Sequence, residues 1–127
     1  MAIFTRFEDI DAWKKGRMLV NQLYKLTRDG EFAKDYGLKD QIQRAAVSIC
    51  SNIAEGYARR GNKELIKFLW IARGSAAEVS SQLYHAKDLG YVNNVSCKKL
   101  FELASLISAE LFSLIKALSK NSERNKL

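Results

Sequence analysis

Basic side chains gather around the six-residue segment ARRGNK and give this chain its clearest chemical signal. Arg59, Arg60 and Lys63 belong to the segment, and Lys67 follows Lys63 after one helical turn, on the same helix face. Residues 44–73 hold six basic side chains and only two acidic ones. A concentrated basic surface is the electrostatic footprint of nucleic-acid binding, with affinity from phosphate contacts. The alternative is a mildly basic, solvated surface that only aids solubility.

Residues that could catalyse a reaction or bind a metal do not assemble into a recognisable site. Glu55 and Glu78 suggest a carboxylate pair, but di-metal bundles use Glu-x-x-His motifs, and here alanine and serine stand three residues after these glutamates. The single histidine, His85, has no evident serine–acid partner. Cys50 and Cys97 are too few for a disulfide framework or a zinc site. We therefore expect no enzymatic activity, no metal and no cofactor.

Polar residues recur at helical steps on two segments that are otherwise rich in small side chains. The first row and its partner row are Arg44, Ser48, Asn52 and Glu55, and Arg73, Ser75 and Glu78. Because buried polar groups need partners, the two rows could satisfy each other across a pair of helices. We interpret them as a structural polar row that fixes helix register and close packing.

The composition describes one ordinary globular domain over residues 1–127. Hydrophobic residues make up 47% and charged residues 28%, with a formal net charge of +7. Proline is absent and glycine occurs seven times, which favours a few long helices joined by short turns. No apolar run approaches the roughly 18 residues of a membrane span, and the N-terminus does not resemble a signal peptide. We expect a cytoplasmic protein that does not bind membranes.

Apolar residues recur at steps of three and four along four segments, which predicts four helices. The expected helices cover residues 9–28, 38–58, 63–89 and 95–120. The segment 29–37 is expected to be a loop, because Gly30 is typical of a helix C-terminus. Four amphipathic helices with short turns predict an all-α fold, an antiparallel up-down-up-down four-helix bundle.

A second basic cluster lies near the C-terminus and is opposed only by Glu123. In an up-down bundle the end of the fourth helix lies beside the turn between the second and third helices. The two clusters could therefore merge into one nucleic-acid-binding patch made of Arg59, Arg60, Lys63, Lys67, Lys116, Lys120 and Arg124.

The third and fourth helices also carry apolar stripes beyond the single face that a monomer core requires. These stripes contain Ile66, Trp70, Ala77 and Tyr84, and Phe101 and Phe112. An exposed apolar face is typical of an interface, so we expect an oligomer. The alternative is that Trp70 and Tyr84 only cover the rim of the monomer core.

Several blocks of the sequence resemble the bacterial four-helix-bundle proteins encoded in intervening sequences of 23S rRNA genes. The blocks that carry the resemblance are YGL, QI, RAAVSI, SNIAEG, FL, IA, GS and Glu78, within residues 36–78. The opening FEDIDAWKKGRMLVNQLYKLT also resembles that family's first helix. The match covers nearly the whole chain. One departure is Val79, where the family usually has leucine.

The resemblance implies a four-helix bundle that forms a ring-shaped homo-oligomer, most often a pentamer. The fold is similar to the accessory protein of diversity-generating retroelements, a basic pentamer that binds nucleic acid and associates with a reverse transcriptase. No enzymatic activity is implied. We expect a non-enzymatic oligomer that contacts the phosphates of structured RNA, or of RNA–DNA intermediates. The alternative is a protein-interaction scaffold whose charge steers a partner protein such as a nucleic-acid enzyme.

Overall fold

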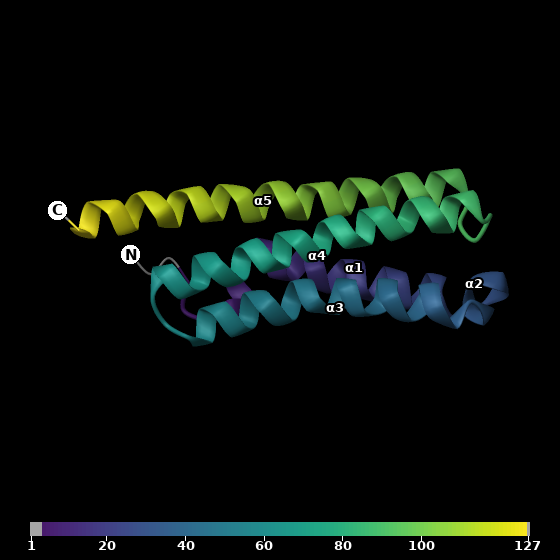
Figure 1. Cartoon of the computed structure of the whole chain (residues 1–127), viewed down its shortest axis with the longest axis horizontal. Coiled ribbons are helices and arrows are strands. Elements are labelled where there is room, and N and C mark those ends of the chain that lie inside the picture. The colour runs from purple at the N-terminus through teal and green to yellow at the C-terminus, as the bar shows by residue number, and fades with distance from the viewer. Residues whose placement is uncertain (1–3, 127) are drawn as a thin grey trace.

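The computed structural model describes the backbone of residues 4–126 and the side chains of residues 4–120. This part of the chain is helical, and its elements are η1 (Phe7–Asp9), α1 (Asp11–Leu26), α2 (Gly30–Lys34), α3 (Tyr36–Ala58), α4 (Asn62–Asp88) and α5 (Asn94–Lys126). Figure 1 shows the four long helices side by side, with successive ones running in opposite directions. The expected all-α bundle is confirmed.

The packing order of the long helices follows the chain. Helix α1 packs on α3 and α5, and α4 packs on the same two helices from the other side. The apolar positions at three- and four-residue steps form the core between them, as their period predicts. Fully buried side chains of this core include Leu23, Ile42, Ile49, Ile53, Leu69, Val79, Leu83, Ile107 and Leu111.

The expected loop between α1 and α3 is wrong, because this segment contains the short helix α2. Phe32 of α2 is buried in the core and stacks on Tyr91, with ring centroids 5.0 Å apart. The Tyr91 hydroxyl donates to Asp35 Oδ2 at 2.9 Å. Asp35 Oδ1 in turn accepts the backbone N–H of Leu38 at 3.1 Å and caps α3. These contacts fix α2 and the α4–α5 turn to the same end of the bundle.

The ends of the helices agree with expectation except at the C-terminus. The other ends of the four long helices lie within two residues of their expected positions, which is the usual uncertainty of a helix boundary. Helix α5 continues to Lys126, six residues beyond its expected end. Within the described residues, no helix has the length and apolarity needed to cross a bilayer.

Candidate nucleic-acid interface

The turn between α3 and α4 reverses the chain within three residues. Arg60 adopts a left-handed backbone conformation with φ of 56°, and Gly61 follows with φ of 120°. Glycine adopts positive φ at little cost, but arginine is strained there by about 1–2 kcal/mol. The reversal leaves Arg59, Arg60 and Lys63 exposed at one end of the bundle.

Two of the predicted phosphate-binding residues lie over the same aromatic ring. The Arg59 guanidinium is 5.1 Å, and the Lys67 ammonium 5.9 Å, from the centroid of Phe68. Glu55 accepts a hydrogen bond from Arg59 at 3.1 Å, so the Arg59 charge is partly neutralised. Arg60, Lys63 and Lys67 form no ion pair with any described carboxylate. Their charges are therefore available to an external anion.

A second basic and aromatic cluster lies between α4 and α5. Trp70 and Phe112 meet edge to face, with ring centroids 6.1 Å apart. The Arg73 guanidinium lies 4.8 Å from the Phe112 centroid and 5.8 Å from that of Trp70, and its Nε donates to the Ser108 carbonyl at 3.3 Å. The Lys116 ammonium is 5.5 Å from the Phe112 ring. Basic residues and the expected interface residues therefore share one face.

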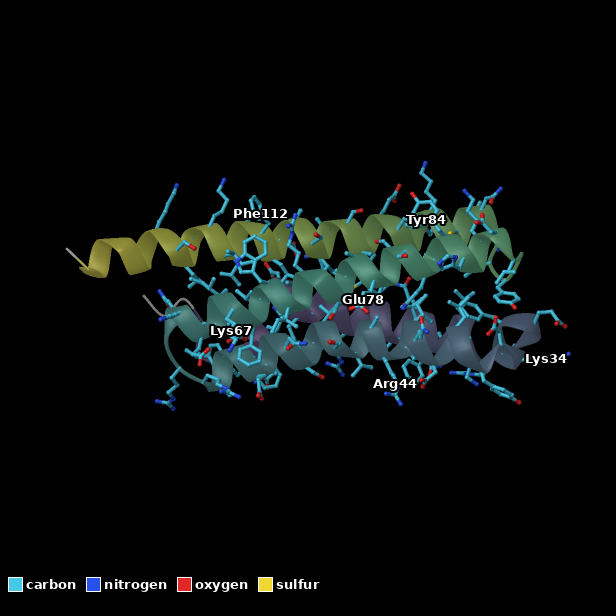
Figure 2. All side chains as sticks on the ribbon, viewed as in Figure 1. Lys34, Arg44, Lys67, Glu78, Tyr84 and Phe112 are labelled. Carbon is cyan, nitrogen blue, oxygen red and sulfur yellow. The ribbon has the colours of Figure 1, made fainter. Side chains whose placement is uncertain are left out.

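Both basic clusters lie at the same end of the molecule. Figure 1 shows that α5 ends at the same end of the bundle as the α3–α4 turn and extends past it, in agreement with an up-down arrangement. Lys67 and Phe112 lie in the same half of the bundle in Figure 2. Lys116 and Lys120 are exposed and have no ion pair among the described side chains. Arg124 lies outside the residues whose side chains are described.

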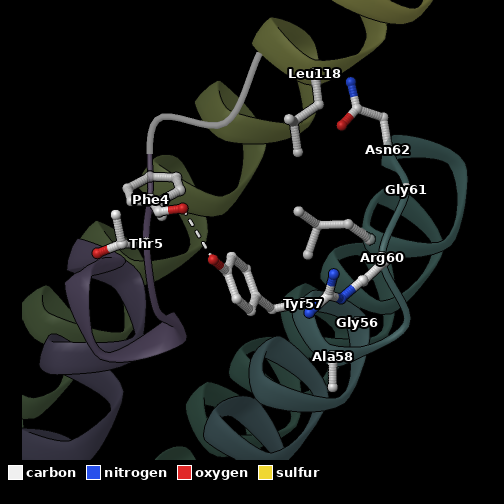
Figure 3. Close-up of a pocket in the computed structure, with 10 residues that line it drawn as sticks. Phe4, Thr5, Gly56, Tyr57, Ala58, Arg60, Gly61, Asn62 and Leu118 are labelled. Atoms are coloured by element: carbon white, nitrogen blue, oxygen red, sulfur yellow. Dashed lines mark hydrogen bonds between the residues drawn. The ribbon is translucent and has the colours of Figure 1, made fainter.

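A pocket of about 790 Å³ opens beside the α3–α4 turn, between the N-terminal segment and α5 (Figure 3). The Tyr57 hydroxyl crosses this region and donates to the Phe4 carbonyl at 2.9 Å. Leu65 and Leu118 supply apolar walls, and Arg60 lies among the lining residues. The pocket thus joins an apolar interior to one cationic group of the basic end.

Comparison with known proteins gives the chain a family. The model of the 23S rRNA-intervening sequence protein family matches residues 8–113. The chain belongs to this family. A crystal structure from the S23 ribosomal protein family of Bacteroides thetaiotaomicron, a protein of unknown function, has a TM-score of 0.75 and 23% sequence identity. The alignment covers 83% of this chain and 98% of that one, and at this identity it shows the fold. No curated protein matches.

The expected interface residues of this 23S rRNA-intervening sequence protein form two separate pairs rather than one continuous patch. Trp70 pairs with Phe112, and Tyr84 pairs with Phe101 at a centroid distance of 4.6 Å. Figure 2 shows Tyr84 and Phe112 well apart along the α4–α5 pair. Ala77 is exposed on α4, whereas Ile66 and Phe101 are only partly exposed because they pack on the core.

Three residues of the expected polar row do meet across α3 and α4. The hydroxyls of Ser48 and Ser75 are 2.9 Å apart. The Asn52 side-chain amide donates to the Ser48 carbonyl at 2.8 Å and to the Ser48 hydroxyl at 2.9 Å. Each group therefore has a partner, as the structural interpretation of this part of the row requires.

The expectation is wrong for the remaining four residues of the row. Arg44 pairs with Asp40 of its own helix at 2.9 Å, and Glu55 pairs with Arg59. Arg73 turns to α5, and Glu78 is exposed and makes no hydrogen bond or ion pair with the described side chains. Helical geometry explains Arg73, because two residues correspond to a rotation of about 200°, so it faces away from Ser75.

Catalytic or metal-binding geometry is not evident in the described part of the chain. Among residues 4–120, no three side chains of His, Cys, Asp or Glu come together as metal ligands would. Cys50 and Cys97 are free thiols. Burial raises the pKa of both thiols, which favours the unreactive neutral form.

A groove that the sequence did not predict lies on the outer side of α4 and α5, at the end away from the α3–α4 turn. It has a volume of about 630 Å³, and its lining includes Tyr84 and Phe101 together with Lys87 and Lys98. The signal was present in the spacing. Lys87 follows Tyr84 by three residues and Lys98 precedes Phe101 by three, which places each lysine beside its aromatic partner on one helix face.

Proposed function

We propose that this protein is a non-enzymatic, cytoplasmic oligomer that binds the phosphates of structured RNA through the basic end of its bundle. The observation that carries the proposal is a set of exposed basic side chains at that end without ion-pair partners among the described residues: Arg60, Lys63, Lys67, Lys116 and Lys120. The family description refers to intervening sequences of 23S rRNA, which makes ribosomal RNA the polyanion to test first.

Phosphate binding is favoured by how these cations are held. Arg59 and Lys67 rest on Phe68, and Lys116 rests on Phe112, so aromatic faces orient part of the cluster before any ligand arrives. Each phosphate neutralised by a basic group releases condensed counterions, so affinity falls steeply with salt. The net charge of +7 also steers the encounter with RNA.

An oligomer would multiply these contacts. Trp70 is 46% exposed and lies beside Arg73 and Phe112. Tryptophan and arginine are enriched among the residues that dominate binding energy at protein interfaces. We propose that a second copy packs on this cluster, in a ring of five as the resemblance implies. Several copies facing one RNA would add weak phosphate contacts by avidity.

The test is a titration of a ribosomal RNA hairpin across a salt series, with light scattering on the same sample. In the triple variant Arg60→Gly, Lys63→Gln and Lys67→Gln, the slope of log affinity against log salt should become shallower by about 2.7, at roughly 0.9 per duplex phosphate contact. Glycine is chosen at position 60 because it accepts the positive φ.

The matched control removes the same charge away from the patch, by Lys25→Gln, Arg28→Gln and Lys34→Gln. Lys34 lies at the opposite end of the bundle (Figure 2). If the patch is the binding site, the control should keep the wild-type slope. Equal slopes in both variants would show that only net charge matters, and would reject a localised site.

A protein-binding scaffold is the second candidate, and the pocket beside the α3–α4 turn favours it. Leu65 and Leu118 offer apolar contact for a partner's side chain, and Arg60 could pair with a partner's carboxylate. Lack of RNA binding at low salt would reject the RNA proposal. Capture of an acidic protein that is lost on Arg60→Glu would then support the scaffold.

A further inference from the structure

The groove at the far end of the α4–α5 face combines aromatic surface with positive charge. The rings of Tyr84 and Phe101 lie 4.6 Å apart at an angle of 50°, and together they form one wall. Tyr84 is 59% exposed, whereas Phe101 packs on the core. Phe101 therefore supports Tyr84 from below and leaves an aromatic face open to solvent.

Two lysines border the same aromatic wall. Lys87 and Lys98 line the groove, and neither forms an ion pair with a described carboxylate. Glu102 is the one carboxylate among the described lining residues, so two lysines outweigh one glutamate and the lining is positively charged overall. Asn94 adds an amide that can both donate and accept hydrogen bonds. The groove thus offers a ring to stack on, cations for phosphate and an amide for a base edge.

We propose that this groove binds one unpaired nucleotide of RNA, with the base on the Tyr84–Phe101 pair and the neighbouring phosphates at Lys87 and Lys98. Stacking on aromatic side chains is how proteins hold single-stranded nucleic acid without sequence preference. The inference rests on the proposed RNA-binding function and adds a second, separate contact to it. Tyr84 lies 14 residues after Trp70, about 21 Å along α4, so the groove is distinct from the basic end.

Charge favours a nucleotide over a second copy of the chain as the occupant. Lys87 and Lys98 line the groove without an ion-pair partner among the described carboxylates, so an occupant that brings negative charge is favoured here. A nucleotide brings this charge as a phosphate. Its planar base also matches the open face of Tyr84, which is 59% exposed.

The experiment compares two RNA ligands with one shared hairpin. One is blunt, and the other carries a 3′ single-stranded tail of about eight nucleotides, within the span that single-strand sites cover. The wild-type protein should bind the tailed hairpin about tenfold more tightly than the blunt one. Tyr84→Ala should abolish this gain and leave the blunt hairpin unaffected, and Tyr84→Phe should keep it because the stacking face remains.

Two further variants test the charges of the groove. Replacing Lys87 and Lys98 by glutamine should make the salt dependence for the tailed hairpin shallower by about 1.4, at roughly 0.7 per single-strand phosphate contact. Glu102→Gln should tighten binding of the tail. The control is Tyr36→Ala, which removes a tyrosine that is 76% exposed and also lies near a lysine, but outside the groove.

The outcomes separate the two proposals. Equal affinity of the wild-type protein for both hairpins would reject the groove and leave the basic end intact. A wild-type protein that binds neither hairpin would reject both the groove and the proposed RNA-binding function. If Tyr84→Ala instead lowers the mass measured by light scattering while the gain from the tail persists, the groove is a contact between copies, and the nucleotide assignment is overturned.

Discussion

Gly56 is a position where α3 packs tightly against α4. A Cβ atom at Gly56 would lie 2.7 Å from Phe68 Cβ and 3.2 Å from Leu65 Cδ1. We expect Gly56→Ala to lower the free energy of unfolding by about 1–2 kcal/mol, because overpacking costs about 1–3 kcal/mol and exceeds the gain in helix propensity. Since Phe68 also carries Arg59 and Lys67 on its ring, the same change should weaken RNA binding.

The control for this prediction is Gly74→Ala on the outer face of α4. Within a single copy of the chain, no atom of another element lies within 4 Å of a Cβ built at Gly74, so in the monomer only helix propensity changes there. Urea denaturation should show this variant more stable than wild type by about 0.5–1 kcal/mol. A Gly56→Ala protein as stable as Gly74→Ala would contradict the close packing of α3 on α4.

At the scale of elements, Cys50 reports on the contact between α1 and α3. Its thiol donates to the Trp13 carbonyl at 3.6 Å and lies against Gly16. Burial raises the pKa of Cys50 from 9.0 to about 11. In a Cys97→Ser background, native Cys50 should react with a thiol reagent at pH 8 about 100-fold more slowly than the unfolded chain, because only the thiolate reacts.

The same shift sets a pH dependence of stability. In the unfolded chain the Cys50 thiol ionises above pH 9, whereas in the folded chain it stays neutral to about pH 11. Its contribution to stability is therefore fully present below pH 9 and is lost as the pH rises toward 11. Replacing Cys50 by alanine should flatten this part of the curve of stability against pH.

In the alkylation experiment, equal rates for the folded and unfolded chains would show that α1 does not cover the Cys50 thiol.

The three- and four-residue spacing of apolar residues predicted the four long helices, but it did not predict the short helix α2. Apolar residues at this spacing on α3 and α4, such as Ile42, Ile49 and Leu83, are buried as the spacing predicts. Helix α2 is five residues long, too short for a period to show, and its position is set by contacts of Phe32 with the distant Tyr91. Such tertiary contacts have no local signature, so the segment was predicted as a loop.

The sequence predicted which basic residues lie at the same end of the bundle, because this depends only on the direction in which each helix runs. Alternating helix directions were enough to bring the C-terminal part of α5 to the same end of the bundle as the start of α4 (Figure 1). Which neighbour a side chain contacts was not predictable, because it depends on rotation about the helix axis. Arg73 therefore contacts Phe112 and Ser108 of α5, and the groove at Tyr84 emerged only when both helices were in place.

At the scale of the whole molecule, the proposed contact between copies lies on the face formed by α4 and α5. We expect Trp70→Glu to give a folded monomer of 14.4 kDa, whereas the proposed ring of five predicts about five times that mass for the wild-type protein. The substitution removes the large Trp70 ring from the proposed contact, and the new carboxylate beside Arg73 makes this surface strongly hydrated, so that burying it against a second copy becomes costly. Light scattering measures the mass, and circular dichroism checks that the helices remain. Tyr24→Glu, on the exposed side of α1, should keep the wild-type mass. A Trp70→Glu protein that keeps its mass would place the contact between copies on another face, and the loss of RNA affinity expected from a monomer would then not occur.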